Sequence, residues 1–307
     1  MTLSPTTKGY FYAFVSVLAT SNVYIFSKAA LGQASLPLFG LYWFAFGLLW
    51  NVLYITKTGK LKYLKKLQTN NYLILLILGL LEIGSTSFFF MAISTVSNPA
   101  IVSFIGNINP VFITILGVIL LRERYNKPEI MGIALILLGA FTVSYKGGNT
   151  FSSMFMNGTQ YVLYSGLFAG ASAIINKKNV KKLTPAIMAL SRNIFLLIFS
   201  FSMMLLLKES FFINWYSLWN IIIGSILGPF LTVIAGYQAI KYIEVSRKSI
   251  LSSTKGIVVM IGAYFYFGKF PELYQIIGGL ISIIGVILIS FGKIIQKKKL
   301  TNLTYKN

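Results

Sequence analysis

Several chemically important residue types are missing from this sequence. It contains no cysteine, no histidine and no aspartate, and all six of its acidic residues are glutamates. Without cysteine there is neither a disulfide framework nor thiol redox chemistry, and the usual zinc ligands are missing as well. Catalytic systems of the Ser-His-Asp and Cys-His kinds are excluded for the same reason. The sequence therefore predicts a protein that is not an enzyme and that holds no metal or other cofactor.

Charge is also scarce, although what there is has one dominant sign. Only 11% of the 307 residues are charged and 56% are hydrophobic, whereas soluble domains carry about 25% charged residues. A net charge of +21 would normally raise the question of nucleic acid. On a chain this hydrophobic the position of the charge matters more than its total, and we expect no nucleic-acid partner.

Long apolar stretches recur along the whole chain. About 20 apolar residues are needed for a helix to cross the hydrocarbon core of a bilayer. Ten stretches approach this length, and they cover residues 9–27, 37–56, 72–93, 98–121, 128–146, 160–176, 185–207, 217–240, 246–267 and 271–292. Small and polar residues interrupt the spans at 160–176 and 246–267. The predicted fold class is an all-α integral membrane protein with ten transmembrane helices.

The cations indicate how these helices are oriented. If the N-terminus is cytoplasmic, most of the 27 Lys and Arg residues lie in cytoplasmic loops and in the C-terminal tail. The opposite side then holds only Lys28, Lys146, Lys208 and Lys269. Cytoplasmic loops carry an excess of Lys and Arg, so both termini are predicted to be cytoplasmic. The composition is typical of a bacterial cytoplasmic membrane protein, and membrane lipids with anionic headgroups are expected partners.

The two halves of the chain resemble each other. Residues 129–139 align with residues 275–285 at an offset of 146, which pairs Gly132 with Gly278 and Gly139 with Gly285. A weaker alignment at an offset of 149 pairs Gly9 with Gly158, Ser16 with Ser165 and Lys28 with Lys177. Glycines spaced in this way also occur in membrane helices simply because they permit close packing.

Each half contains five predicted spans, which is an odd number. The second half must therefore enter the membrane from the opposite face, and inverted repeats of this kind are typical of secondary transporters. The predicted organisation is a first five-helix repeat over residues 1–148, a second, inverted one over 155–293, and a basic cytoplasmic tail over 294–307.

One stretch of the first half points to a known family. Asn109-Pro110 lies inside the fourth span, Glu123 follows the end of that span, and a glycine-spaced fifth helix begins after it. This pattern resembles the EamA-type domain of the drug/metabolite transporter superfamily. The second copy keeps the glycines but has Lys269 in place of Glu123 and Gly256 in place of Pro110. The resemblance implies a transporter, most members being exporters of amino acids, drugs or metabolites, with related branches that carry nucleotide sugars or sugar phosphates.

Charged side chains at bilayer depth are the first candidates for a functional site, because each costs at least about 2.5–3.5 kcal/mol to insert. Glu82 and Lys255 lie about 15 Å along their spans from the cytoplasmic ends, which is near the midplane. Arg192 lies about 10 Å along its span and is expected to extend toward the membrane surface. Glu82 and Lys255 either form a buried ion pair that fixes helix packing or line a central cavity. In a cavity, Lys255 would hold a carboxylate or phosphate, and Glu82 an ammonium group or a coupling proton.

Polar and aromatic residues at similar depth extend the candidate substrate-binding or coupling site. Thr86 lies one helical turn from Glu82 on the same face. Asn22, Asn107, Asn109 and Tyr237 complete the predicted site. Pro110 leaves the backbone carbonyl four residues earlier without its helical partner, so this carbonyl is expected to line the cavity.

The sequence thus predicts a secondary-active transporter, and export of a small metabolite such as an amino acid by alternating access is the first hypothesis. The alternative substrate is an anionic solute such as a sugar phosphate or nucleotide sugar, which Lys255 and Arg192 would bind. An intramembrane enzyme with a Ser252–Lys255 dyad and a non-transporting scaffold or receptor are hypotheses of other classes. General acid–base chemistry in such an enzyme would need a partner network that the sequence does not offer, and a scaffold or receptor would not explain charges at midplane depth in both halves.

Overall fold

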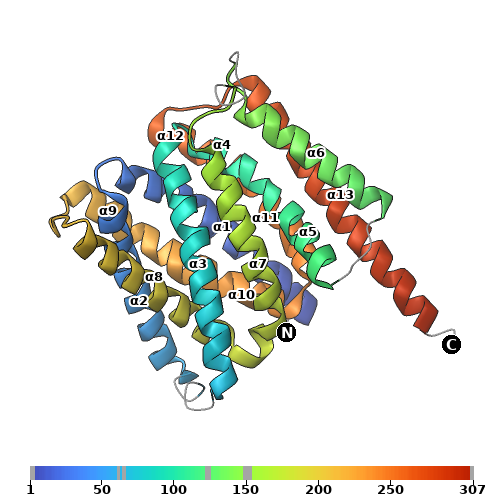
Figure 1. Ribbon diagram of the computed structural model, residues 1–307, viewed down its shortest axis with the longest axis horizontal. Helices are drawn as coiled ribbons and strands as arrows, with labels where there is room; N and C mark the ends of the chain where they lie inside the picture. Colours follow the sequence, from blue (N-terminus) through green and yellow to red (C-terminus); the bar gives the residue numbers. More distant parts are fainter. Residues whose placement is uncertain (1–3, 61–62, 64–66, 122–125, 148–153, 305–307) are drawn as a thin grey trace.

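The computed structural model of the 307-residue chain describes residues 4–60, 63, 67–121, 126–147 and 154–304. Apart from an isolated bridge between Tyr145 and Phe155, these residues form helices and their connections (Figure 1). The helices of the first half are α1 (Pro5–Leu31), α2 (Leu36–Lys57), α3 (Thr69–Thr95), α4 (Pro99–Ile105), α5 (Asn109–Leu121) and α6 (Lys127–Ser144). Those of the second half are α7 (Thr159–Leu183), α8 (Pro185–Leu206), α9 (Trp215–Ser225), α10 (Val233–Tyr242), α11 (Val245–Ser253), α12 (Lys255–Phe267) and α13 (Leu273–Thr304).

Helix starts are encoded by a short polar cap followed by proline. Ser4, Ser35 and Asn98 each accept a hydrogen bond from a backbone N–H of the first turn, and each is followed within two residues by a proline. Proline suits the first turn because its fixed φ is helical and its missing N–H would be unpaired there. Asn126 and Glu129 form a reciprocal capping box at the start of α6.

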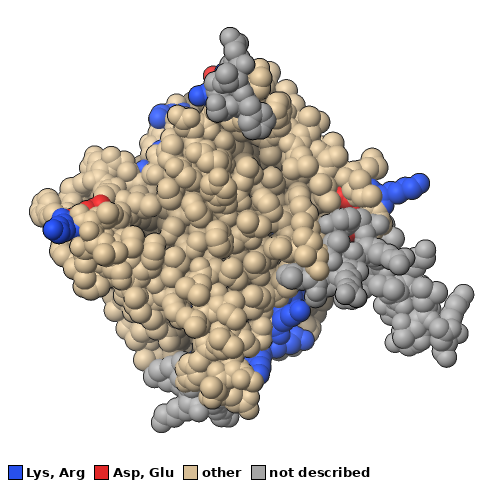
Figure 2. All heavy atoms as spheres, viewed as in Figure 1, with Lys and Arg blue, Asp and Glu red and all other residues tan. Residues whose placement is uncertain are grey.

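Nine helical segments of the described residues are long and apolar enough to cross a membrane. The remaining long helix, α7, packs against α3 and α5 and is less apolar because polar residues such as Ser172 and Asn176 lie along it. Figure 2 shows that uncharged residues cover the broad face of the bundle and that Lys and Arg lie toward its edges. The predicted all-α integral membrane fold is confirmed.

Three spans are interrupted where they pass through the middle of the bundle. A 3₁₀ turn, η2 (Gly106–Ile108), separates α4 from α5 just before Pro110, as expected for a proline that cannot donate to the preceding turn. The corresponding span of the second half breaks at Thr254, between α11 and α12. A π-helical segment, η3 (Ile226–Thr232), joins α9 to α10 around Pro229. In membranes, irregular backbone of this kind is tolerated where it is buried in protein or lines a cavity.

The first helix of each half packs against the other half. Ser16 on α1 donates to the carbonyl of Thr232 at 3.1 Å, and Ser165 on α7 donates to the carbonyl of Ser85 on α3 at 2.8 Å. Ser16 and Ser165 are 149 residues apart, and Thr232 and Ser85 are 147 residues apart. The same contact is therefore made twice, once in each direction, as two inverted halves require.

Two lysines make a second pair of equivalent contacts, each within its own half, at opposite ends of the bundle. Lys28, near the end of α1, donates to three carbonyls at the C-terminal end of α3, those of Ile93 (2.9 Å), Ser94 (3.0 Å) and Val96 (2.7 Å). Lys177 on α7 donates to the carbonyls of Ile240 (2.7 Å) and Ile243 (3.0 Å) at the end of α10. A cation at a helix C-terminus is stabilised by the helix dipole, and its N–H groups satisfy carbonyls that lack helical partners.

The paired glycines of the fifth helices form a close contact between the halves. A Cβ atom at Gly139 would lie 2.5 Å from the carbonyl oxygen of Gly278, and one at Gly285 would lie 2.7 Å from that of Gly132. Helices α6 and α13 lie side by side along this seam (Figure 1). The glycines therefore allow the two backbones to approach.

Two parts of the sequence pattern fall differently in the structure. Helix α13 continues through the predicted span into the basic tail, as far as Thr304. Glu123 of the family pattern lies outside the described residues.

Candidate functional site

A cavity of about 390 Å³ lies where the interrupted spans of the two halves meet. Such a volume is within the range of small-molecule sites in proteins. The charged or polar side chains that line it are Thr20, Glu82, Ser85, Asn107, Asn109, Ser172, Asn176, Thr232, Tyr237, Lys248, Ser249, Ser252, Ser253 and Lys255. They come from both halves, and the unwound backbone at Gly106 is among the lining groups. The expectation that Pro110 opens the backbone toward a cavity agrees with this geometry.

Glu82 on α3 is held by two side chains from facing helices. Its Oε2 atom accepts a hydrogen bond from Nε of Arg192 on α8 at 2.7 Å, and both side chains are 15% exposed. The Nη2 atom of Arg192 also donates to Thr86 at 2.8 Å. Ser172 on α7 donates to Oε1 of Glu82 at 2.7 Å, and Asn176 donates to Ser172 at 2.9 Å. The carboxylate is thus neutralised and bonded at both oxygens.

This geometry corrects two expectations. The buried ion pair of the midplane joins Glu82 to Arg192 and not to Lys255. Arg192 does not extend to the membrane surface, because its guanidinium group is directed inward onto Glu82 and Thr86. Counting residues along a span gives depth but not the direction in which a side chain leaves the helix. Arg192 pairs with Glu82 because α8 packs against α3.

Lys255 faces the cavity together with a second lysine, Lys248. Lys248 lies seven residues earlier, about two helical turns, and so on the same side of the interrupted span. A Cβ atom at Gly106 would lie 3.9 Å from Nζ of Lys255, which places this ammonium group over the unwound backbone of η2. In the described part of the chain neither lysine forms an ion pair with a carboxylate. Lys255 lies close enough to Lys248 to feel its positive charge, and Lys248 in turn feels the negative charge of Glu82. The cavity therefore carries an excess of positive charge.

Asparagines of both halves bring hydrogen-bond acceptors to the same region. Nδ2 of Asn107 donates to Oγ of Ser282 at 2.9 Å, which leaves its buried Oδ1 without a partner in the described residues. Asn176 likewise has a buried Oδ1 without a partner. Asn109 and Tyr237 also line the cavity. Unpaired amide oxygens therefore lie in the walls of the cavity, close to its ammonium groups.

The structure does not bring every predicted residue to the cavity. The side chain of Asn22 is exposed and donates to the carbonyl of Leu18 on its own helix at 2.9 Å. Thr86 is buried beside the cavity, where it acts on Glu82 through Arg192. Glu82, Lys255, Asn107, Asn109 and Tyr237 do share the cavity.

Sequence reasoning missed Lys248, Ser172 and Asn176. Lys248 lies close to a predicted span end, so its position in the sequence favours a cytoplasmic loop over the cavity. A seven-residue spacing from Lys255, with serines at 249 and 252 between them, was the available signal for a shared face. Ser172 and Asn176 are four residues apart on α7, which is the corresponding signal there.

Inverted halves, interrupted helices and a charged cavity at their junction are the features of a membrane transporter. Comparison with known proteins agrees. The model of the EamA-like transporter family matches residues 7–145 and 156–291, and the chain belongs to this family. The chain is 27% identical to the uncharacterized transporter YyaM of Bacillus subtilis (strain 168) over 249 residues, which is 78% of each protein. A solved crystal structure with 15% identity shares the fold, with a TM-score of 0.67 over 92% of this chain and 96% of that one. These findings favour a transporter over an enzyme.

Proposed function

We propose that this membrane transporter moves a small metabolite with an anionic group, such as the carboxylate of an amino acid, by alternating access. The observation that carries the proposal is the pair of ammonium groups of Lys248 and Lys255 in a cavity whose carboxylate, Glu82, is already neutralised by Arg192. An unpaired charge at membrane depth is costly, and an incoming anion would offset that cost. Lys255, at the helix break, is the group we assign to the anion.

An amino acid is the first candidate because the cavity also offers acceptors for an ammonium group. The unpaired Oδ1 atoms of Asn107 and Asn176 suit a donor on the substrate. A dianion such as a sugar phosphate is the second candidate, and the excess of positive charge from two lysines favours it.

We further propose that the protein is an exporter in a bacterial cytoplasmic membrane, with both termini in the cytoplasm. Support for the orientation comes from the scarcity of cations on the side of Lys28, Lys208 and Lys269. A proton is the coupling ion that we favour, since protonation of Glu82 would release Arg192 and so link the cavity to the packing of α3 and α8.

Transport by proteoliposomes tests the proposal. Radiolabelled amino acids and sugar phosphates are offered separately, with and without an imposed pH gradient, to the wild-type protein, Lys255→Met and Lys208→Met. We expect the wild-type protein to transport one class, Lys255→Met to lose at least 90% of that flux, and Lys208→Met, an exposed lysine far along the chain from the cavity, to keep it. Unchanged rate and affinity in Lys255→Met would contradict the proposal.

A further inference from the structure

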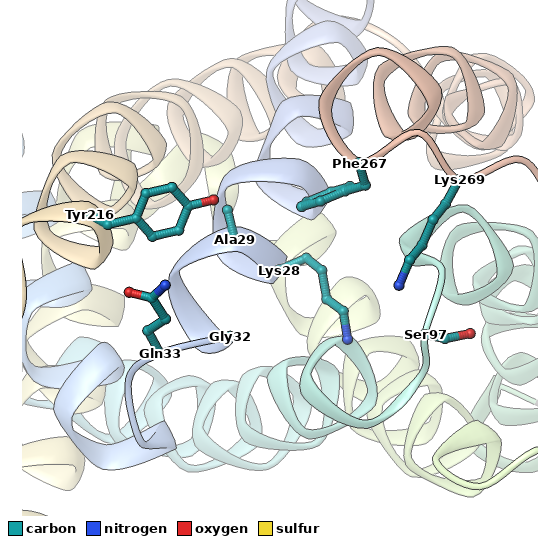
Figure 3. Close-up of a pocket in the computed structure, with 8 residues that line it drawn as sticks. All are labelled: Lys28, Ala29, Gly32, Gln33, Ser97, Tyr216, Phe267 and Lys269. Atoms are coloured by element: carbon teal, nitrogen blue, oxygen red, sulfur yellow. The ribbon is translucent and has the colours of Figure 1, made fainter.

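A second pocket lies near the end of the bundle that we place opposite the cytoplasm. It has a volume of about 240 Å³ and is lined by residues that include Lys28, Gln33, Ser97, Tyr216 and Lys269. Figure 3 shows the ammonium ends of Lys28 and Lys269 converging on one side of α1, with Ser97 beside them. Both halves contribute, through α1 and the α3–α4 connection in the first and α9 and the end of α12 in the second.

Positive charge is concentrated in this pocket, compared with the rest of the predicted outer side. The sequence puts four cations on the predicted outer side, and two of them, Lys28 and Lys269, meet in this pocket. In the described part of the chain neither has a carboxylate within ion-pair distance, and Lys28 lies close enough to Lys269 to feel its positive charge. Two like charges at close range repel each other, and a bound anion offsets this repulsion because it attracts both.

The two lysines are built into the pocket in different ways. All three N–H donors of Lys28 are used by the carbonyls at the end of α3, so its charge is fixed in place. Lys269 follows Gly268, which ends α12 with a φ of +64° and turns the chain. Lys269 is exposed, and no hydrogen bond from its side chain to another described residue is recorded. Its donors are therefore available to a ligand.

The pocket is aligned with the central cavity. Lys255 begins α12 and Lys269 follows its end, and 13 helical residues correspond to about 20 Å. The space between them is filled by packed side chains, since Tyr24, Ile25, Val259 and Ala263 belong to one buried apolar cluster. A binding site at midplane, an apolar barrier and a second cationic pocket thus follow one another along α1 and α12.

We propose that the pocket at Lys28 and Lys269 is an outer anion-binding subsite, where the carboxylate or phosphate of the transported solute binds on the far side of the apolar barrier. The inference rests on the proposed function, because it takes the same anionic group as the ligand of both sites. Lys28 supplies a fixed charge, and Lys269 supplies hydrogen-bond donors.

Equilibrium dialysis with radiolabelled inorganic phosphate tests this subsite. The full-length protein is placed in phosphatidylcholine nanodiscs at constant ionic strength, and bound phosphate is counted per protein. We expect two sites in the wild-type protein, one in Lys269→Gln, two in Lys269→Arg, which keeps the charge, and two in Lys208→Gln as the matched control. Two sites of unchanged affinity in Lys269→Gln would overturn the inference, as would one site in the wild-type protein that Lys255→Gln removes.

Two further arms separate the possible failures. In Lys255→Gln we expect the central site to be lost and the outer one to remain; retention of both sites would count against the proposed function and not against the outer subsite. Repeating the wild-type measurement in nanodiscs with phosphatidylglycerol distinguishes a dissolved anion from a lipid headgroup. We expect two sites again, and loss of the site that depends on Lys269 would assign the pocket to lipid and overturn the inference.

Discussion

Glu82 illustrates how one residue in a membrane serves packing and the binding site together. Its carboxylate lines the cavity, yet both oxygens are bonded, one to Arg192 and one to Ser172. The interaction joins α3, α7 and α8 at one point. Because Arg192 already neutralises Glu82, what remains for a substrate to neutralise is the charge of Lys248 and Lys255.

The ion pair should be measurable as coupling between its two members. Removing one partner from a buried pair typically costs about 3–5 kcal/mol, because the other charge is left unpaired. We expect Glu82→Gln and Arg192→Gln each to destabilise the protein by about 3 kcal/mol. The double variant should be less destabilised than the sum of the two. Denaturant titrations in detergent, followed by tryptophan fluorescence, give these values, and additive effects would contradict the pairing.

The sequence predicted which residues lie at midplane more reliably than which residues touch. Counting along the spans gives midplane depth for four residues that line the cavity, namely Glu82, Lys255, Asn107 and Asn109. Asn22 was placed by the same count, but it faces outward from α1. Depth follows from the rise per residue, whereas the direction of a side chain depends on how its helix rotates and packs against its neighbours.

At the scale of elements, the backbone breaks were only partly predictable. Pro110 and Gly256 marked two of the three interruptions, because proline removes a donor and glycine weakens a helix. The π-helical segment at Pro229 was not predicted, since a proline inside an apolar run can bend a helix without ending it. The glycine spacing of the fifth helices predicted close packing, and α6 and α13 do make that contact.

Close packing of α6 and α13 should depend on the absence of a side chain at Gly139. A methyl group there would meet the carbonyl oxygen of Gly278 and the backbone of Ser282, neither of which can give way as a flexible side chain can. We expect Gly139→Ala to destabilise the protein by about 1–3 kcal/mol, the usual range for overpacking. Thermal unfolding in detergent measures the effect.

Gly262 on α12 is the matched control for this substitution. Its added methyl group would meet only the side chain of Ile25, at 3.3 Å. Alanine also has the higher helix propensity, so we expect Gly262→Ala to be neutral or slightly stabilising. Equal destabilisation by the two variants would contradict the claim that close packing of α6 and α13 requires glycine at position 139.

At the scale of the whole molecule, the natural absence of cysteine makes the orientation directly testable. Thr58, after α2, and Lys208, after α8, are exposed and lie on opposite predicted sides of the membrane. In intact bacteria we expect a membrane-impermeant maleimide to label Lys208→Cys and to leave Thr58→Cys unlabelled until the cells are broken. The reverse labelling pattern would contradict the cytoplasmic placement of the termini.

The reciprocal contacts of α1 and α7 also bear on how the protein is made. Ser16 lies on α1, and it bonds to the segment that leads into α10, about 200 residues later in the chain. Helix α3 in turn receives Ser165 from α7. These two contacts cannot form until α7 to α10 have been inserted beside the first half, whereas Lys28 finds its partners on α3 of its own half.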